Sequence, residues 1–309
     1  MIDASATAQG ASATSAEVAS ATSVSVIVPA YNERATIAQE VLSIRQSLEG
    51  ETFSPLEVLV VDDGSTDGTA ELARAAGATV IQHPVNLGQG AAIRTGITNS
   101  HGAHVVIIDA DGTYPTQDLP RLVSFSAESG YEQVVGDRQS EQGTLRLLRV
   151  PVKRLLRMFA AFLSGQAVGD MNSGMRVLTR EAALRYLTLI PDGFSNSTTL
   201  TLASLSHGGR IAFLPIDYKA RMDGRSKFRP IEDTYNMMLT IIRMVMYVDP
   251  LRVLLPVAFL FLAGGFAKAL TDIFRFDLHI TTSSVLVIMT GIQIAAIALI
   301  ADLIVRRTR

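Results

Sequence analysis

Short apolar runs alternate with helical patterns through the first part of the chain. Four runs rich in Val and Ile are typical of buried strands, at residues 24–29, 56–62, 79–83 and 103–109. Three segments between these runs predict helices, at residues 33–48, 66–77 and 90–100. Apolar strands that alternate with helices indicate an α/β fold, with a mostly parallel sheet covered by helices on both faces.

The C-terminal part has a different pattern, because two long apolar segments follow each other at 251–271 and 283–305. Each is long enough for a membrane-spanning helix, which needs about 20 residues. The short connector predicts a tight hairpin whose outer flanks lie on the same side of the membrane. Those flanks carry basic residues, at Arg243, Arg252, Arg306, Arg307 and Arg309. The positive-inside rule therefore places the N-terminal domain and both termini in the cytoplasm.

Three other segments complete the predicted organisation. Residues 1–22 are mostly Ala, Ser and Thr, which is typical of a disordered tail. Residues 146–165 mix Arg and Lys with Leu and Phe, which fits a helix on an anionic membrane surface or a surface helix of the domain. The Met- and Ile-rich segment 231–249 fits a second interfacial helix or a buried core helix. We expect a domain at 23–230, an amphipathic juxtamembrane helix at 231–250 and the hairpin at 251–309.

Composition narrows the classes of function. Hydrophobic residues make up 48% of the chain, and their excess is concentrated in the C-terminal segments, which supports membrane insertion. The net charge of −2 offers no basic surface for nucleic acid. The chain has no cysteine, which excludes disulfides, a thiolate metal site and a cysteine nucleophile.

Acidic residues collect where the predicted strands end, which is where parallel sheets bind ligands. Asp109 and Asp111 follow the apolar run VVII and are separated by one small residue. Two carboxylates so close repel each other unless a cation lies beside them. A hard divalent cation such as Mg²⁺ or Mn²⁺ is the natural partner and would bridge a diphosphate. Asp62 and Asp63 end another strand, where Gly64 permits a tight turn and a carboxylate can accept hydrogen bonds from a base or a ribose.

The polar motifs occur in the order seen in a known family. They are PAYNE (29–33), VDDGSTDGT (61–69), NLGQGAAIRTG (86–96), DADGTYP (109–115), DMNSGMRV (170–177) and DGRSKF (223–228). With the C-terminal spans, the chain resembles family 2 glycosyltransferases of the GT-A fold, in the branch that transfers hexoses to polyprenyl phosphates. The resemblance covers residues 24 to about 305 and implies that the domain at 23–230 is catalytic.

The resemblance also implies roles for single residues. Those that would hold the nucleotide are Pro29, Tyr31, Glu33, Asp63 and Asp109. Those that would act in catalysis are Asp111, Asp170, Arg225 and Lys227. Those that would bind the acceptor phosphate are Arg138, Arg154 and Arg221. Asp109 and Asp111 would hold the metal, and the segment with Arg221, Arg225 and Lys227 closes over the site in relatives.

Two positions depart from the family pattern. Gln89 stands where many relatives have lysine in the pattern N-x-G-K-G, which removes one phosphate-directed charge. Thr113 replaces a glutamine that helps the metal in some relatives, which leaves the detailed coordination open.

The implied reaction is an inverting transfer of a hexose from a UDP- or GDP-linked sugar to undecaprenyl or dolichyl phosphate. A phosphate monoester is largely dianionic at neutral pH, so it is already a nucleophile and needs positioning by arginine more than a general base. If Asp170 were indispensable, a hydroxyl acceptor would be favoured, because its proton must be removed.

Two other interpretations stay open. One is a membrane-anchored transferase that acts on a soluble glycan or a protein hydroxyl, which gives the basic segment 146–165 no role. The other is a non-catalytic membrane scaffold on a degenerate transferase fold, which predicts eroded acids. A processive polysaccharide synthase is disfavoured, because its Q-x-x-R-W signature needs tryptophan and the chain has none. Relatives are often homo-oligomers, and the sequence fixes neither a subunit number nor the sugar.

Overall fold

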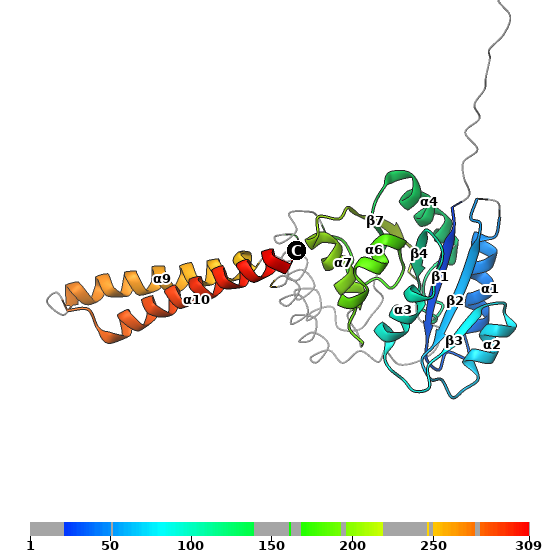
Figure 1. Cartoon of the computed structure of the whole chain (residues 1–309), viewed down its shortest axis with the longest axis horizontal. Coiled ribbons are helices and arrows are strands. Elements are labelled where there is room, and N and C mark those ends of the chain that lie inside the picture. The colour runs from blue at the N-terminus through cyan, green and yellow to red at the C-terminus, as the bar shows by residue number, and fades with distance from the viewer. Residues whose placement is uncertain are drawn as a thin grey trace, which may run out of the picture.

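A computed structural model describes residues 22–50, 52–138, 161, 168–192, 196–218, 246, 250–275 and 279–308. Within these residues, seven strands form one sheet (Figure 1). They are β1 (Val24–Ala30), β2 (Leu56–Asp62), β3 (Thr79–Gln82), β4 (His104–Ile107), β5 (Gln133–Arg138), β6 (Arg176–Thr179) and β7 (Ile211–Ile216). The predicted tail at 1–22 and the predicted helix at 231–250 lie almost entirely outside the described residues.

The sheet is mostly parallel, as predicted. The strand order is β3-β2-β1-β4-β6-β5-β7, and of the described strands only β6 runs antiparallel to its neighbours. The register aligns Val26 of β1 with Val58 of β2 and with Val106 of β4. The carboxyl ends of β1, β2, β4 and β5 therefore meet at one edge of the sheet, together with the amino end of β6.

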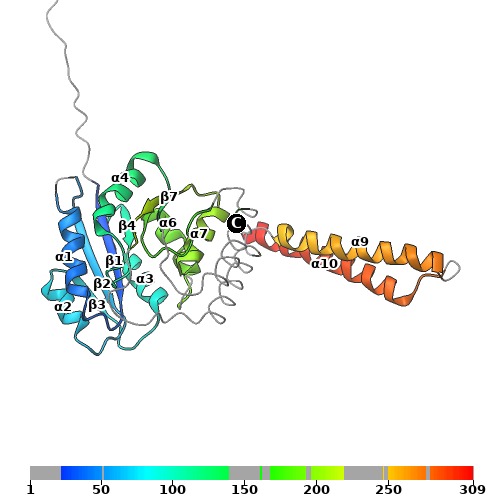
Figure 2. The same cartoon turned by 180° about the vertical axis from the view of Figure 1, so that it is seen from behind.

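Helices cover both faces of this sheet (Figures 1 and 2). One face carries α1 (Ile37–Leu48), α2 (Thr69–Ala75) and α4 (Leu119–Ser129), with the short 3-10 helix η1 (Thr116–Asp118) before α4. The other carries α3 (Gln89–Thr98), α6 (Arg180–Arg185) and α7 (Asn196–Ser206), with a second 3-10 helix, η2 (Leu187–Leu189). Val26 of β1 belongs to the core under α1 with Val41, whereas Ile27 belongs to the core under α3 with Ile93. The strand is buried on both sides, which explains why the consecutive residues 26–28 are all apolar.

Two helices begin later than the sequence predicts. α2 begins at Thr69 rather than at residue 66, because Gly68 has a φ of 89°, which lies outside the helical region. The Asp67 carboxylate accepts a hydrogen bond from the Thr69 N–H at 3.0 Å and so fixes the turn before the helix. α1 begins at Ile37 rather than at residue 33, and the Thr36 hydroxyl before it donates to the carbonyl oxygen of Ala110 at 2.8 Å. Both loops are thereby held at the edge of the sheet where the strands end.

The C-terminal helices α9 (Pro250–Arg275) and α10 (Thr282–Thr308) form a hairpin that extends away from the sheet (Figures 1 and 2). Both are long and apolar enough to cross a membrane, and only 17% of each apolar stretch is buried, unlike a core helix of a soluble protein. They agree with the spans predicted at 251–271 and 283–305. The two helices approach closely at Gly265, where a Cβ would lie 2.7 Å from the Ile288 side chain.

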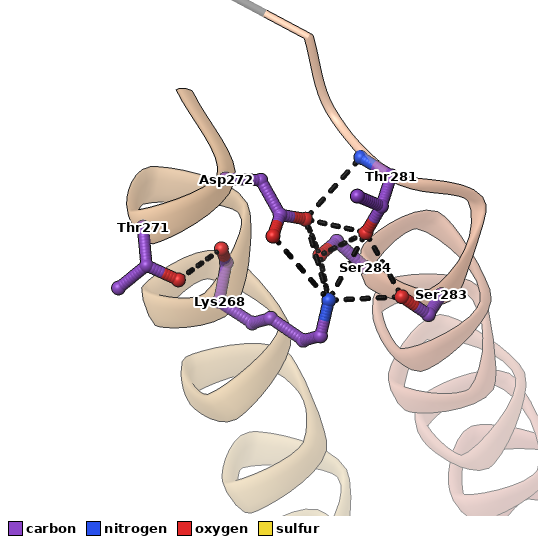
Figure 3. A network of polar contacts seen from close by, with 6 residues as sticks. All are labelled: Lys268, Thr271, Asp272, Thr281, Ser283 and Ser284. Atoms are coloured by element: carbon purple, nitrogen blue, oxygen red, sulfur yellow. Dashed lines mark hydrogen bonds and ion pairs between the residues drawn. The ribbon is translucent and has the colours of Figure 1, made fainter. Parts of the chain in front are cut away.

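A polar network joins the two helices at the end of the hairpin farther from the sheet (Figure 3). The Lys268 ammonium donates to the hydroxyls of Thr281, Ser283 and Ser284 at 3.0, 2.8 and 3.1 Å. It also lies 3.3 Å from the Asp272 carboxylate, which accepts from the Thr281 N–H at 3.2 Å. These polar groups satisfy one another within the hairpin, so they fix the position of α9 relative to α10.

Candidate active site

The loops after β1 and β2 are tied to each other at the open edge of the sheet. The Asn32 N–H donates to the Ser65 hydroxyl at 2.9 Å, and the Asn32 side chain accepts from the Thr66 N–H at 3.0 Å. Asn32 has a φ of 54°, a conformation that asparagine tolerates better than most residues. This loop places Tyr31 and Glu33 at the edge, and 36% of the Tyr31 surface is exposed. The nucleotide contacts predicted for Tyr31 and Glu33 stay predictions.

Asp63 lies behind that edge and holds the loop that leads into α3. It is 3% exposed, and its carboxylate accepts from the N–H groups of Leu87 and Gly88 at 2.9 and 2.8 Å. It also lies 2.7 Å from His83 Nδ1. Gly64 allows the close approach, because a Cβ there would lie 2.7 Å from the Val85 carbonyl carbon. The nucleoside contact predicted for Asp63 stays a prediction; its described contacts shape the loop at 83–88.

Asp109 follows β4 and lies between the start of α3 and the turn before β6. The Gln89 side chain donates to Asp109 Oδ1 at 2.9 Å. Gly174 packs directly on the same carboxylate, because a Cβ there would lie 2.6 Å from Asp109 Cγ. The Gly174 N–H donates to the Tyr114 hydroxyl at 2.6 Å. Burial and the Asp109 charge raise the pKa of Tyr114, so its phenol stays protonated.

Gln89 and Thr113, the two positions that depart from the family pattern, each hydrogen-bond one carboxylate of the acid pair. Gln89 supplies a neutral hydrogen bond to Asp109 where a lysine would supply charge. Thr113 orients Asp111, whose Oδ1 accepts from the Thr113 hydroxyl at 2.6 Å and from its N–H at 3.2 Å. Gly112, with a φ of 70°, makes that short turn possible.

The chemistry of the acid pair fits a hard divalent cation. Asp109 and Asp111 offer carboxylate oxygens, the ligands that Mg²⁺ and Mn²⁺ prefer. The described residues contain no group of three or more His, Cys, Asp or Glu side chains that could hold a metal by themselves. Such a sparse set suits a cation that takes its remaining ligands from substrate phosphates and water.

Arg138, predicted to bind the acceptor phosphate, and Asp170, predicted to act in catalysis, meet in an ion pair at the same edge. The Arg138 Nε donates to Asp170 Oδ2, and the guanidinium lies 5.1 Å from the centre of the Tyr218 ring. The side chains are only 14% and 5% exposed. Burial lowers the pKa of Arg138, but the neighbouring Tyr114 and Asp170 outweigh it, and the net shift is upward. A cation held in this way is permanently charged and preorganised for an anion.

Arg176 is a structural residue of the site that the sequence analysis missed. It is fully buried on β6 and donates to the carbonyl oxygens of Met171, Ser173 and Ser197, at 3.3 Å to Met171 and 2.7 Å to Ser197. Burial lowers its pKa to about 10, which leaves it protonated at neutral pH. Arg176 therefore fixes the turn at 170–174 against α7. The available signal was a charged residue directly before the apolar pair Val177 and Leu178.

The structure brings many of the predicted residues together. Those at the open edge of the sheet are Pro29, Tyr31, Glu33, Asp63, Asp109, Asp111, Arg138 and Asp170. Arg154, Arg221, Arg225 and Lys227 lie outside the described residues, as does most of the basic segment 146–165. Their roles stay predictions.

Comparison with known proteins gives two matches of family models. The model described as Glycosyl transferase family 2 matches residues 25–187, which is more than half of the chain. The model described as GtrB C-terminal hairpin matches residues 249–306, which contain α9 and almost all of α10.

Individual relatives extend over most of the chain. Glycosyltransferase AglJ from Haloferax volcanii is 32% identical over 291 residues, which cover 91% of this chain and 93% of that protein. The undecaprenyl-phosphate 4-deoxy-4-formamido-L-arabinose transferase of Yersinia enterocolitica is 29% identical over 253 residues, which cover 80% of this chain and 74% of that protein.

A solved structure shares the fold. Glucosyl-3-phosphoglycerate synthase from Mycobacterium tuberculosis, in complex with Mn²⁺, uridine-diphosphate-glucose and phosphoglyceric acid, superimposes with a TM-score of 0.58 at 26% identity. The superposition covers 72% of this chain and 80% of that one.

Proposed function

Because this chain belongs to glycosyl transferase family 2 and has the GT-A fold, we propose that it transfers a hexose from a UDP- or GDP-linked sugar to a polyprenyl phosphate, with inversion at the anomeric carbon. One observation carries the proposal. The acid pair Asp109 and Asp111 and the ion pair of Arg138 with Asp170 share one edge of the sheet, in a chain that ends in an apolar hairpin. The first pair suits a cation-bound diphosphate, and the second suits an anionic acceptor.

On the donor side, Asp109 and Asp111 would hold Mg²⁺ or Mn²⁺. The cation would neutralise charge that develops on the departing nucleoside diphosphate. The solved relative that contains Mn²⁺ and uridine-diphosphate-glucose supports this assignment. Gln89 and Thr113 keep the two carboxylates oriented through the hydrogen bonds described above. Tyr31 and Glu33 would contact the nucleoside.

On the acceptor side, Arg138 would bind the phosphate of a polyprenyl phosphate. Its guanidinium is fixed by Asp170 and Tyr218, so little side-chain entropy is lost when the anion arrives. The match of the C-terminal helices to a family hairpin supports an acceptor that lies in the membrane, and so does the name of the Yersinia enterocolitica relative. Arg154 and Arg221 would complete the phosphate site.

The reaction needs no base in this arrangement. A phosphate oxygen of the acceptor attacks the anomeric carbon, a new carbon–oxygen bond forms, and the bond to the diphosphate oxygen breaks on the opposite side. The acceptor phosphate is largely dianionic at neutral pH and gives up no proton during the attack. Arg138 positions the nucleophile, and Arg225 and Lys227 would stabilise the leaving diphosphate.

The hairpin also supports a topology. The start of α9 and the C-terminus lie at the end of the hairpin nearest the sheet (Figure 1). If both helices span the bilayer, the catalytic domain and the C-terminus share one side. The arginines on the hairpin flanks favour the cytoplasm as that side under the positive-inside rule.

The test is a transfer assay with the purified full-length protein in vesicles that contain undecaprenyl phosphate. A panel of UDP- and GDP-linked hexoses is supplied with Mg²⁺ or Mn²⁺, and lipid products are identified by mass. We expect one donor to yield undecaprenyl phosphate that carries one hexose. Failure of every donor, together with failure to bind any nucleoside diphosphate, would support the non-catalytic scaffold.

Variants separate the two kinds of acceptor. Arg154→Ala and Arg138→Ala should each lower turnover with the lipid phosphate, whereas Arg74→Ala, an exposed arginine on α2, should leave it unchanged. Full turnover of Arg154→Ala on a soluble glycan or protein acceptor would favour the hydroxyl-directed enzyme. Asp170→Asn tests the same point, because direct attack by phosphate tolerates loss of a base better than attack by a hydroxyl does.

A further inference from the structure

His83 is a largely buried histidine to which the proposed reaction gives no role. It directly follows β3, and 9% of its side chain is exposed. Its Nδ1 lies 2.7 Å from Asp63 Oδ1, and its Nε2 lies 2.9 Å from the Thr95 hydroxyl on α3. Its N–H donates to the carbonyl oxygen of Asp62 at 2.9 Å, which fixes the backbone beside the end of β2. Both nitrogens of the ring are therefore occupied, and the ring connects Asp63 with α3.

The two ring nitrogens of His83 have different roles. A carboxylate accepts hydrogen bonds and donates none, so Nδ1 carries the proton and donates to Asp63. In the neutral ring Nε2 is then the acceptor, and the Thr95 hydroxyl donates to it. Thr95 thus fixes the ring, and the ring fixes the carboxylate.

The hydrogen bonds to Asp63 leave one direction of the carboxylate for a further donor. A carboxylate has about four acceptor positions, two on each oxygen. His83 and the Leu87 N–H occupy those of Oδ1, and the Gly88 N–H occupies one of Oδ2. Within the part of the chain that the structure describes, one acceptor position of Oδ2 remains. The three donors together set the plane of the carboxylate, and that plane sets the direction of the remaining position.

An aspartate carboxylate has no strong orientation of its own. Its terminal torsion χ2 is broad, so neighbouring hydrogen bonds decide how the plane of the two oxygens is turned. The Leu87 and Gly88 N–H groups come from a single loop, whose residues 84–87 are exposed. His83 is the donor that a second element, α3, holds in place through Thr95.

We propose that His83 is a positioning residue of the donor site, which turns Asp63 so that its remaining acceptor position meets an N–H group of the nucleoside base. Uracil and guanine both carry a ring N–H, so UDP- and GDP-linked sugars both meet this requirement. A carboxylate fixed before the ligand arrives loses little freedom when it binds. The inference rests on the proposed use of a nucleotide sugar and on the nucleoside contact predicted for Asp63.

Binding measurements separate a contact to the base from general support of the site. UDP, GDP and pyrophosphate are titrated by calorimetry into the purified full-length protein with Mn²⁺. His83→Phe should weaken binding of the preferred nucleotide by about 5- to 10-fold, part of the effect of a hydrogen bond to a charged group. Binding of pyrophosphate, which has no base, should change little. Equal losses for nucleotide and pyrophosphate would overturn the proposal.

His101→Phe is the matched control. The His101 side chain is 82% exposed, and the residue lies in the turn before β4. This variant should leave binding of the nucleotide and of pyrophosphate unchanged. Thermal unfolding of each variant checks that it is folded.

Conservative variants test the Nδ1 donor itself. The amide nitrogen of Asn lies about as far along the side chain as Nδ1 does, and that of Gln as far as Nε2. His83→Asn should therefore retain most of the nucleotide binding, whereas His83→Gln should behave like His83→Phe. Thr95→Val, which has nearly the same shape and lacks the hydroxyl, should weaken binding in the same direction, and it carries the test if His83→Phe does not fold. Equal binding by the Asn and Gln variants would refute the role of Nδ1.

Transfer assays distinguish this inference from the proposed function. The His83→Phe variant should raise KM for the nucleotide sugar and change kcat little. Nucleotide binding by the wild type without any lipid product would count against the proposed reaction and leave the role of His83 standing. Unchanged nucleotide binding in His83→Phe would overturn the positioning role and leave the reaction standing. Failure of the wild type to bind any nucleoside diphosphate would overturn both.

Discussion

Gly174→Ala gives a sharp test of how the turn before β6 supports the acid pair. The glycine lies against Asp109, and a Cβ at this position would stand 2.6 Å from Asp109 Cγ and closer still to its Oδ2. Ordinary contacts begin at 3.4 Å. The carboxylate must therefore retreat by about 1 Å, a displacement that can cost about 100-fold in rate when it affects a catalytic group.

The same substitution has a limited effect on the backbone. Gly174 has no left-handed φ, so alanine is strained by the contact and not by its conformation. The Gly174 N–H can still reach the Tyr114 hydroxyl. We therefore expect turnover to fall by about 100-fold while the protein stays folded.

The assay is sugar transfer at several Mn²⁺ concentrations, with thermal unfolding as a check on folding. Gly264→Ala is the matched control, because a Cβ at Gly264 meets nothing within 4 Å. Wild-type turnover in Gly174→Ala would refute the argument that this glycine positions Asp109. A large fall in Tm, with normal turnover by the protein that remains folded, would show that Gly174 contributes to folding stability only.

Three further outcomes are expected. Gln89→Leu removes the hydrogen bond to Asp109 and should lower kcat/KM by about 5- to 10-fold, the worth of one net hydrogen bond, as measured by steady-state transfer. Gln89→Lys, with an added charge, should partly restore it. Arg176→Met leaves carbonyl oxygens at 171, 173 and 197 unpaired, so the free energy of unfolding should fall by about 3 kcal/mol or more in a denaturant titration. Removal of divalent cations with EDTA should abolish transfer, and Mn²⁺ or Mg²⁺ should restore it; persistent activity would contradict the cation role of Asp111.

The sequence predicts the main strands and helices well, because each of them depends on the residue types within its own segment. β1 is buried on both faces, so apolar residues run without interruption from Val26 to Val28, and the polar motif follows where the strand ends. Asp109 and Asp111 could be predicted as site residues for the same reason, because they directly follow a buried apolar strand. In both cases the information lies in neighbouring residues of one segment.

Contacts between distant segments could not be read in this way. Asp63 is recognisable as an acid at a strand end, but its bonds to Leu87 and Gly88 depend on how the next loop folds back. Arg176 bonds carbonyl oxygens of the turn before β6 and of α7. The residue types of these two segments do not reveal that their carbonyl groups face Arg176. The departure at Gln89 suggested a lost charge, whereas the structure shows a specific hydrogen bond to Asp109.

The charges at the open edge give a physical reason for the role predicted for the cationic segment. Asp109 and Asp111 already bring negative charge, and the donor diphosphate and acceptor phosphate each add about two more. Like charges 4 Å apart repel by about 4 kcal/mol at an effective dielectric constant of 20, so both substrates cannot bind without added cations. Arg138 already pairs with Asp170, so an acceptor phosphate must share its guanidinium with that carboxylate. Under the proposed function, productive binding of the two substrates would depend on a divalent cation at the acid pair, and we predict that Arg221, Arg225 and Lys227 supply the further positive charge.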